Sequence, residues 1–95
     1  MPQYFEKDPQ GKVPYSIDWG KKFLPVGDTI TTSTWTVSDP AITIVGTPGI
    51  TVDGRETTVW LSGGTADTLY EATNHIISVG GIESDESIFI HVKQL

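Results

Sequence analysis

Residues 58–81 read TVWLSGGTADTLYEATNHIISVGG, and this stretch decides the fold because it holds two alternating runs, each followed by a pair of glycines. In the first run, Val59 and Leu61 fall on one side of an extended chain and Trp60 falls on the other. In the second run, one side collects Tyr70, Ala72, Asn74 and Ile76. A period of two predicts half-buried β-strands, and the Gly-Gly pairs permit the chain reversals after them.

Similar short runs occur along the rest of the chain. They lie at 15–19, 29–37, 42–45 and 87–92, separated by Gly, Pro and Asp residues that favour turns. We expect GTPG at 46–49 to end the third of these runs, and Asp53-Gly54 to form a two-residue hairpin turn. No run has the 3.6-residue period of a helix. The pattern therefore predicts an all-β fold, an Ig-like β-sandwich of about seven short strands.

Three residues have specific expected places in this sandwich. Trp35 shares a side with Val37 and is expected in the core. Tyr70 opens the next-to-last strand, where Ig-type sandwiches often place a Tyr whose hydroxyl closes the corner, although simple packing of its ring fits equally well. Asn74 is at an inward position, and a buried amide must satisfy its donors and acceptors, so we expect it to bond neighbouring backbone.

The N-terminal residues have a different character. The sequence predicts an extended arm over residues 1–12 and the Ig-like domain over residues 13–95. The arm holds prolines, mixed charges and two adjacent aromatics, Tyr4 and Phe5. Such a segment buries too little surface to offset its ordering entropy, so we expect it to be loose in the isolated chain. We expect Tyr4 and Phe5 to order it against a partner chain.

Composition limits the classes of function. The chain has 95 residues, no cysteine and a formal net charge of −6. The negative surface repels phosphate backbones and anionic lipids, which argues against nucleic acid or membrane partners. The absence of cysteine excludes a disulfide scaffold. The N-terminal stretch lacks the order of charged and apolar regions that marks a signal peptide, so we expect synthesis in the cytoplasm.

No cluster with the pattern of a catalytic site stands out. His75 and His91 lie at outward strand positions, and the sequence favours solvated side chains for both. Ser62 and Ser87 could be imagined as nucleophiles, but neither sits in a Gly-x-Ser-x-Gly elbow. We therefore expect no catalytic residues and no enzyme activity.

Metal and cofactor binding are also not expected. Glu83, Asp85 and Glu86 could ligate calcium through their oxygens, but they lack the spacing of an EF-hand loop. A solvated hairpin tip is the favoured interpretation of this acidic stretch. The Gly-Lys pairs at 11–12 and 20–21 lack the rest of a phosphate-binding loop.

The order of motifs resembles a family of small tailed-phage proteins, the fibre-tail adaptors and related Ig-like virion proteins. The resemblance runs from about Lys7 to Val92, through KDPQGKVPYSIDWGKKF, GDTITTSTWTV, TTVWLSGGTADTLYEATNHI and GGIESDESIFIHV. VWLSGG and SIDW in this order carry most of its specificity. The chain departs from the pattern at GTPGITVDGR, the middle hairpin. The resemblance implies a structural protein of the virion, built with other tail, fibre or head–tail connector subunits in copies set by the particle's symmetry.

Three functions fit these observations. The first is an adaptor that joins tail and tail fibre, the second is a capsid decoration protein, and the third is a carbohydrate-binding module. The candidate interface residues are the exposed aromatics of the arm and of outward strand positions: Tyr4, Phe5, Trp60 and Phe89. Outward aromatics are common anchors of protein interfaces.

Overall fold

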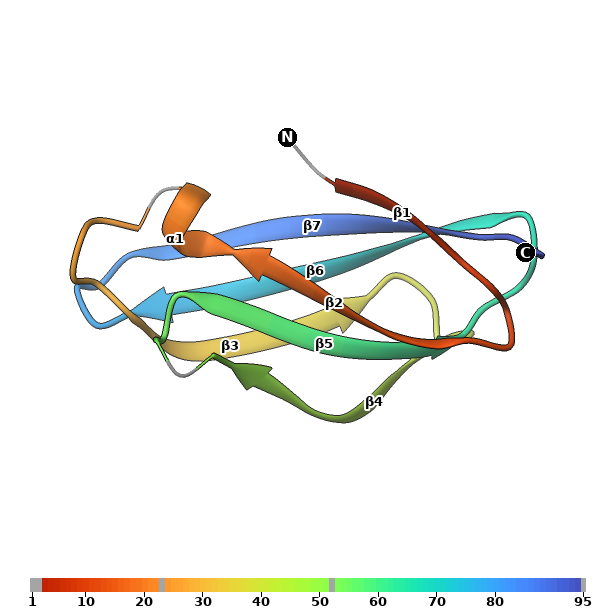
Figure 1. Ribbon diagram of the computed structural model, residues 1–95, viewed down its shortest axis with the longest axis horizontal. Helices are drawn as coiled ribbons and strands as arrows, with labels where there is room; N and C mark the ends of the chain where they lie inside the picture. The colour runs from red at the N-terminus through yellow and green to blue at the C-terminus, as the bar shows by residue number, and fades with distance from the viewer. Residues whose placement is uncertain (1–2, 23, 52, 95) are drawn as a thin grey trace.

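Two β-sheets packed face to face make up the protein in a computed structural model, which describes residues 3–22, 24–51 and 53–94 (Figure 1). The elements in chain order are β1 (Gln3–Lys7), β2 (Lys12–Asp18), α1 (Trp19–Lys22), β3 (Ile30–Val37), β4 (Ile42–Ile50), β5 (Glu56–Gly63), β6 (Thr68–Ser78) and β7 (Glu83–Val92). One sheet has the order β1-β7-β6-β3 and the other has the order β2-β5-β4. The molecule measures 41 × 26 × 19 Å along its principal axes.

The strand order confirms the Ig-like sandwich. Ig-type domains place the second, fifth and fourth strands in one sheet and the third, sixth and seventh in the other. The same division is present here, as β2-β5-β4 against β7-β6-β3. The first strand, β1, joins the second of these sheets and runs parallel to β7. All the other strand pairings among the described residues are antiparallel.

The core lies between the sheets and follows the predicted alternation. Its buried apolar residues are Tyr15, Ile17, Trp19, Leu24, Ile30, Trp35, Ile42, Val59, Leu61, Tyr70, Ala72, Ile76, Ile88, Ile90 and Val92. Trp35 is 6% exposed, which confirms its predicted place in the core. The residues that alternate with these core positions point outward, so the outer face of each sheet is also fixed by the sequence pattern.

Tyr70 closes the corner before β6. Its hydroxyl oxygen accepts a hydrogen bond from the backbone N–H of Thr65 at 2.8 Å, while its ring is buried. This is the corner arrangement expected of Ig-type sandwiches, and it confirms the first of the two interpretations of this residue.

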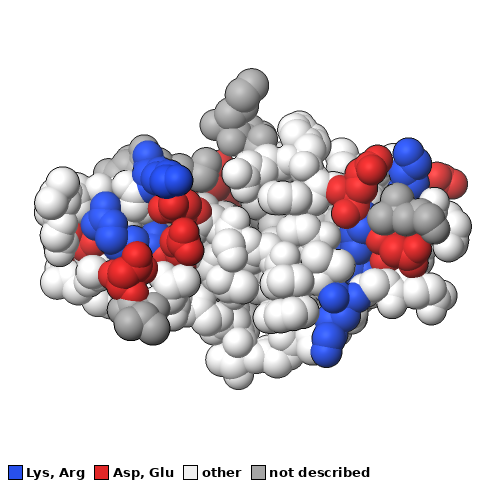
Figure 2. All heavy atoms as spheres, viewed as in Figure 1, with Lys and Arg blue, Asp and Glu red and all other residues white. Residues whose placement is uncertain are grey.

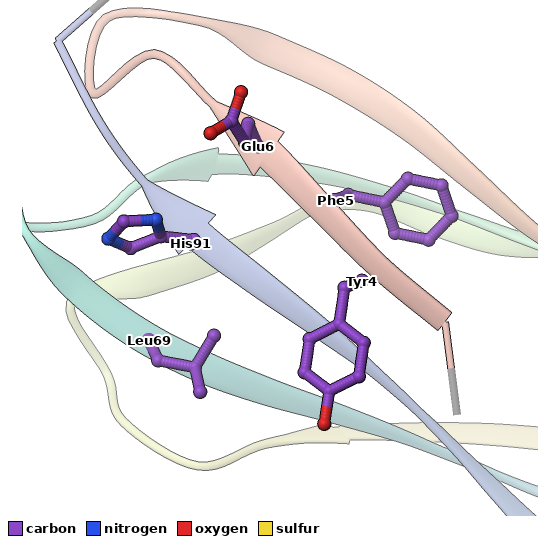
Figure 3. A pocket seen from close by; sticks show the side chains of 5 residues that line it. All are labelled: Tyr4, Phe5, Glu6, Leu69 and His91. Atoms are coloured by element: carbon purple, nitrogen blue, oxygen red, sulfur yellow. The ribbon is translucent and has the colours of Figure 1, made fainter. Parts of the chain in front are cut away.

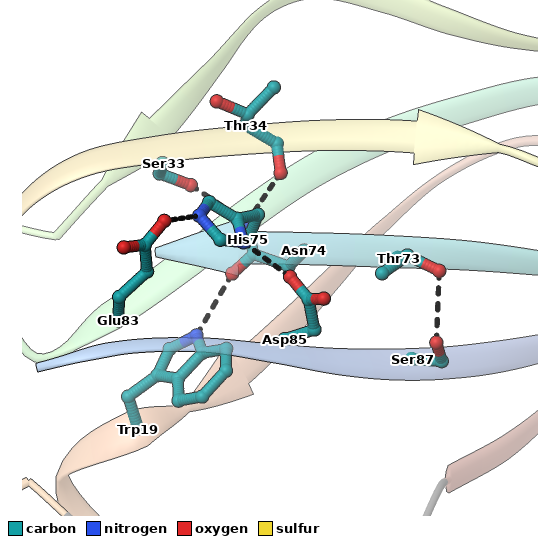
Figure 4. Close-up of polar contacts among 9 residues, drawn as sticks. All are labelled: Trp19, Ser33, Thr34, Thr73, Asn74, His75, Glu83, Asp85 and Ser87. Atoms are coloured by element: carbon teal, nitrogen blue, oxygen red, sulfur yellow. Dashed lines mark hydrogen bonds and ion pairs between the residues drawn. The ribbon is translucent and has the colours of Figure 1, made fainter. Parts of the chain in front are cut away.

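Asn74 is fully buried and links the two sheets (Figure 4). Its Oδ1 accepts hydrogen bonds from Trp19 Nε1 at 2.9 Å and from Thr57 Oγ1 at 2.6 Å. Its Nδ2 donates to Ser33 Oγ at 2.9 Å and to the carbonyl oxygen of Thr34 at 3.1 Å. The amide therefore bonds three side chains and one backbone carbonyl, whereas the sequence suggested backbone partners.

The N-terminal segment is a strand of the chain's own sheet, unlike the loose arm expected for the isolated chain. Phe5 points inward and packs on Tyr15, with ring centroids 4.9 Å apart. Lys7 is 1% exposed, and its Nζ donates to the carbonyl oxygens of Gly63 at 2.7 Å and Asp8 at 2.9 Å. Burial lowers the pKa of this ammonium. The arm thus buries Lys7 and part of Phe5, which helps to offset the entropy cost of ordering it. The division at residues 12 and 13 stays a prediction.

The middle hairpin differs from its prediction. Strand β4 continues through GTPG to Ile50, and its pairing with β5 shifts register between Val45 and Gly49. Gly46 takes a positive φ of 69°, so the predicted strand end is an irregularity inside a longer strand. The turn is also longer than two residues, because β5 begins only at Glu56 and the Thr51 N–H donates to the Glu56 carbonyl.

Candidate protein interface

An aromatic pair lies on the outer face of the four-stranded sheet. Tyr4 of β1 and Phe89 of β7 are register neighbours, and their rings stack at 5.1 Å between centroids with an angle of 18°. Tyr4 is 68% exposed. Leu69 of β6 is also exposed and lies directly beside His91 of β7, the next outward residue after Phe89.

Tyr4, Leu69 and His91 border an open groove across β1, β7 and β6 (Figure 3). We call it the Tyr4 groove; its volume is about 470 Å³, and its lining residues are Tyr4, Phe5, Glu6, Leu69 and His91. The Glu6 carboxylate lies at the groove, 3.5 Å from Lys93 Nζ. The groove therefore combines apolar walls with an acidic group, a composition suited to binding a protein side chain.

Trp60 lies on the opposite side of the sandwich, on the outer face of the three-stranded sheet. Its register neighbours are Pro14 on β2 and Val45 on β4. We call the surface formed by these three uncharged residues, Pro14, Val45 and Trp60, the Trp60 face. Trp60 is 43% exposed, and Lys12 Nζ lies 5.9 Å from its ring centroid. Figure 2 views the molecule with the three-stranded sheet toward the reader, and charged side chains gather toward the two ends of the long axis. The middle of this face is mostly uncharged.

The four candidate interface residues are therefore not brought together. Tyr4 and Phe89 form one patch, Trp60 belongs to another, and Phe5 is half-buried against the core. Their role in binding stays a prediction. Leu69 and His91 were missed as groove residues, although both have outward parity in the sequence; only the strand register shows that they meet.

His75 is bound by two carboxylates (Figure 4). Its Nδ1 lies 2.5 Å from Asp85 Oδ1, and its Nε2 lies 2.7 Å from Glu83 Oε2. The hydrogen bond to Asp85, and to a smaller extent the hydrogen bond to Glu83, raises the pKa of the His75 imidazole. The exposed side chains of His75, Glu83 and Asp85 agree with the predicted solvation. The sequence did not indicate the ion pairs, which form because both acids lie on β7, with Asp85 directly opposite His75, and not at a hairpin tip.

This arrangement does not assemble a nucleophile. Both ring nitrogens of His75 face carboxylates, and the Ser87 hydroxyl is hydrogen-bonded to Thr73 Oγ1 at 2.9 Å. Within residues 3–22, 24–51 and 53–94, no group of three or more His, Cys, Asp or Glu side chains is placed to hold a metal ion. No helix in the same ranges is long and apolar enough to span a membrane.

A second hollow, of about 440 Å³, lies among the loops before β3 and β5. Its basic residue, Arg55, already donates to the carbonyl oxygens of Asp28 at 2.7 Å and Leu24 at 3.2 Å. The Arg55 guanidinium therefore holds these two loops together, and this structural role accounts for a basic residue in the second hollow.

The described residues thus form an Ig-like sandwich with an exposed aromatic side chain on the outer face of each sheet. The family to which this sandwich belongs follows from the comparison with known protein families. Residues 7–91 match the family described as "Podophage GP4 fiber-tail adaptor protein gp77", and the chain belongs to this family of phage structural proteins. The resemblance predicted from the sequence motifs is thereby confirmed. No curated protein matches the chain.

Proposed function

We propose that this protein is a non-enzymatic virion protein that joins a phage tail to a tail fibre through the two outer faces of its sandwich. The observation that carries the proposal is the presence of an exposed aromatic side chain on each outer face: Tyr4, stacked on the half-buried Phe89, on one and Trp60 on the other. An adaptor needs two separate docking surfaces. A single sandwich with an apolar patch on each side supplies both.

The exposed aromatics are suited to anchoring partners. Tyr and Trp side chains bury large areas with few rotatable bonds, and they dominate the binding energy of many interfaces. On the Trp60 face, the strand neighbours Pro14 and Val45 carry no charge, so the charge that a covering partner must accommodate is the Lys12 ammonium, 5.9 Å from the Trp60 ring centroid. In the Tyr4 groove, Leu69 extends the apolar surface beside the ring pair.

The core fixes the two faces relative to each other. Trp60 alternates with Val59 and Leu61, which are fully buried, and Phe89 alternates with the buried Ile88 and Ile90. Both anchors therefore stand on strands of the same packed core. Such a module transmits position and load from one partner to the other without a flexible linker.

Family membership supports the adaptor over the capsid-decoration and carbohydrate-binding alternatives. The partners we propose are tail and tail-fibre subunits, with several copies of this chain arranged by the symmetry of the particle.

Binding assays with single-face variants test this proposal. The probes are phage tails assembled without this protein and purified tail fibres, each measured against the wild type, Tyr4→Ser and Trp60→Ser. We expect each variant to lose one partner, with an increase in Kd of about 30-fold, and to bind the other normally. Val26→Ser serves as the matched control, because Val26 is a fully exposed apolar residue in a loop outside both faces. Two outcomes would contradict the two-face arrangement. In the first, one variant loses binding to both tails and fibres; in the second, both variants bind both partners normally.

A further inference from the structure

The outer face of the four-stranded sheet has an excess of carboxylates. Its outward acidic residues are Glu6, Glu71, Glu83 and Asp85. The basic groups that face them are Lys93, already 3.5 Å from Glu6, together with His75 and His91. His75 is bound by Glu83 and Asp85. Beside the Tyr4 groove, the two carboxylates of Glu6 and Glu71 outnumber the Lys93 ammonium, and the whole chain has a formal net charge of −6.

The aromatic pair lies between two of these carboxylates. Glu71 on β6 is the register neighbour of Phe89, and Glu6 is the next outward residue after Tyr4 on β1. The face of an aromatic ring attracts cations, and Tyr4 is 68% exposed although one side of its ring stacks on Phe89. Exposed aromatic surface and carboxylates are thus available at one place.

We infer that the Tyr4 groove binds an arginine-bearing segment of the partner protein, an assignment that rests on the proposed adaptor function. A guanidinium is planar, stacks on aromatic faces and pairs with carboxylates through two parallel hydrogen bonds. The aliphatic part of the same side chain lies along apolar surface, which Leu69 supplies here. Charge complementarity with a basic partner also accelerates association.

Charge-neutral variants and salt dependence test the inference. The probe is whichever of the two partners, fibre-free tails or purified fibres, loses binding to Tyr4→Ser. We expect Glu71→Gln to raise the Kd by about tenfold, since it removes a charged hydrogen-bond acceptor. Glu6→Gln should act in the same direction. The association rate of the wild type should fall at least about tenfold between low and high salt, because screening suppresses electrostatic steering.

Two control variants make the result specific. Glu56→Gln removes one carboxylate from β5, in the other sheet, and should leave binding of this partner unchanged. Tyr4→Phe keeps the aromatic ring and should bind this partner nearly as the wild type does. Tyr4→Leu removes the ring and should bind it more weakly. Thermal unfolding of each variant checks that the fold is retained.

The outcomes separate this inference from the proposed function. If Tyr4→Ser loses one partner but Glu71→Gln, Glu6→Gln and salt have no effect, the groove binds an uncharged segment. The arginine assignment is then wrong, and the adaptor function stands. If Tyr4→Ser also binds both partners normally, the groove is no docking site and both proposals lose their support on this face.

Discussion

Replacing Trp35 by alanine should lower the free energy of unfolding by roughly 3–5 kcal/mol, the cost of deleting a large aromatic side chain from a packed core. Trp35 is 6% exposed on β3 and belongs to the core cluster, which includes residues of both sheets. Its indole Nε1 is buried and has no hydrogen-bond partner among the described residues, so the loss is one of packing alone. Chemical denaturation followed by fluorescence or circular dichroism measures the change.

Two further variants sharpen this test. Trp35→Phe should cost much less than Trp35→Ala, because it keeps an aromatic ring and removes a buried donor without a partner. Trp60→Ala should change stability by less than about 1 kcal/mol, since Trp60 is 43% exposed on the outer face. Equal effects of Trp35→Ala and Trp60→Ala would contradict the assignment of inner and outer faces.

Asn74→Ala should destabilise the protein by roughly 2–4 kcal/mol, because it leaves polar groups without partners inside the core. The Oδ1 atom of Asn74 accepts from Trp19 Nε1 and Thr57 Oγ1, and all three residues are fully buried. Trp19 Nε1 keeps a longer contact of 3.2 Å with Thr57 Oγ1, which limits the loss. Denaturant unfolding monitored by circular dichroism measures this change.

The control for Asn74 is its outward neighbour. Thr73→Ala removes the 2.9 Å hydrogen bond to Ser87 on the outer face and should cost less than about 1 kcal/mol, because water replaces the lost partner. A cost for Asn74→Ala as small as that for Thr73→Ala would show that the amide does not link the sheets.

The sequence alone predicts which strand side chains face the core and which face solvent, because this depends only on the alternation of apolar and polar residues along each strand. Trp35, Tyr70 and Asn74 lie inward and Trp60 and Phe89 outward, as the period of two indicated. Solvent on one side of each strand and the core on the other impose this pattern residue by residue, so it needs no knowledge of the strand partners.

Features that depend on strand partners could not be predicted. The stack of Tyr4 on Phe89 requires β1 to pair with β7, two strands at opposite ends of the sequence. The ion pairs of His75 require the register that places Asp85 opposite it. The N-terminal segment has a composition typical of a free arm, and only the half-buried ring of Phe5 and the buried side chain of Lys7 show why it is a strand.

The most direct test of the central claim is a count of fibres per particle by cryo-electron microscopy. Tails assembled without this protein are mixed with purified fibres and with wild-type protein, Tyr4→Ser, Trp60→Ser, or both variants together. Wild-type protein should restore attachment, and each variant alone should not. The mixture of both variants should also fail, because one molecule must use both faces to join two partners. Fibre attachment at the wild-type level with either variant, or its full recovery with the mixture, would contradict the account.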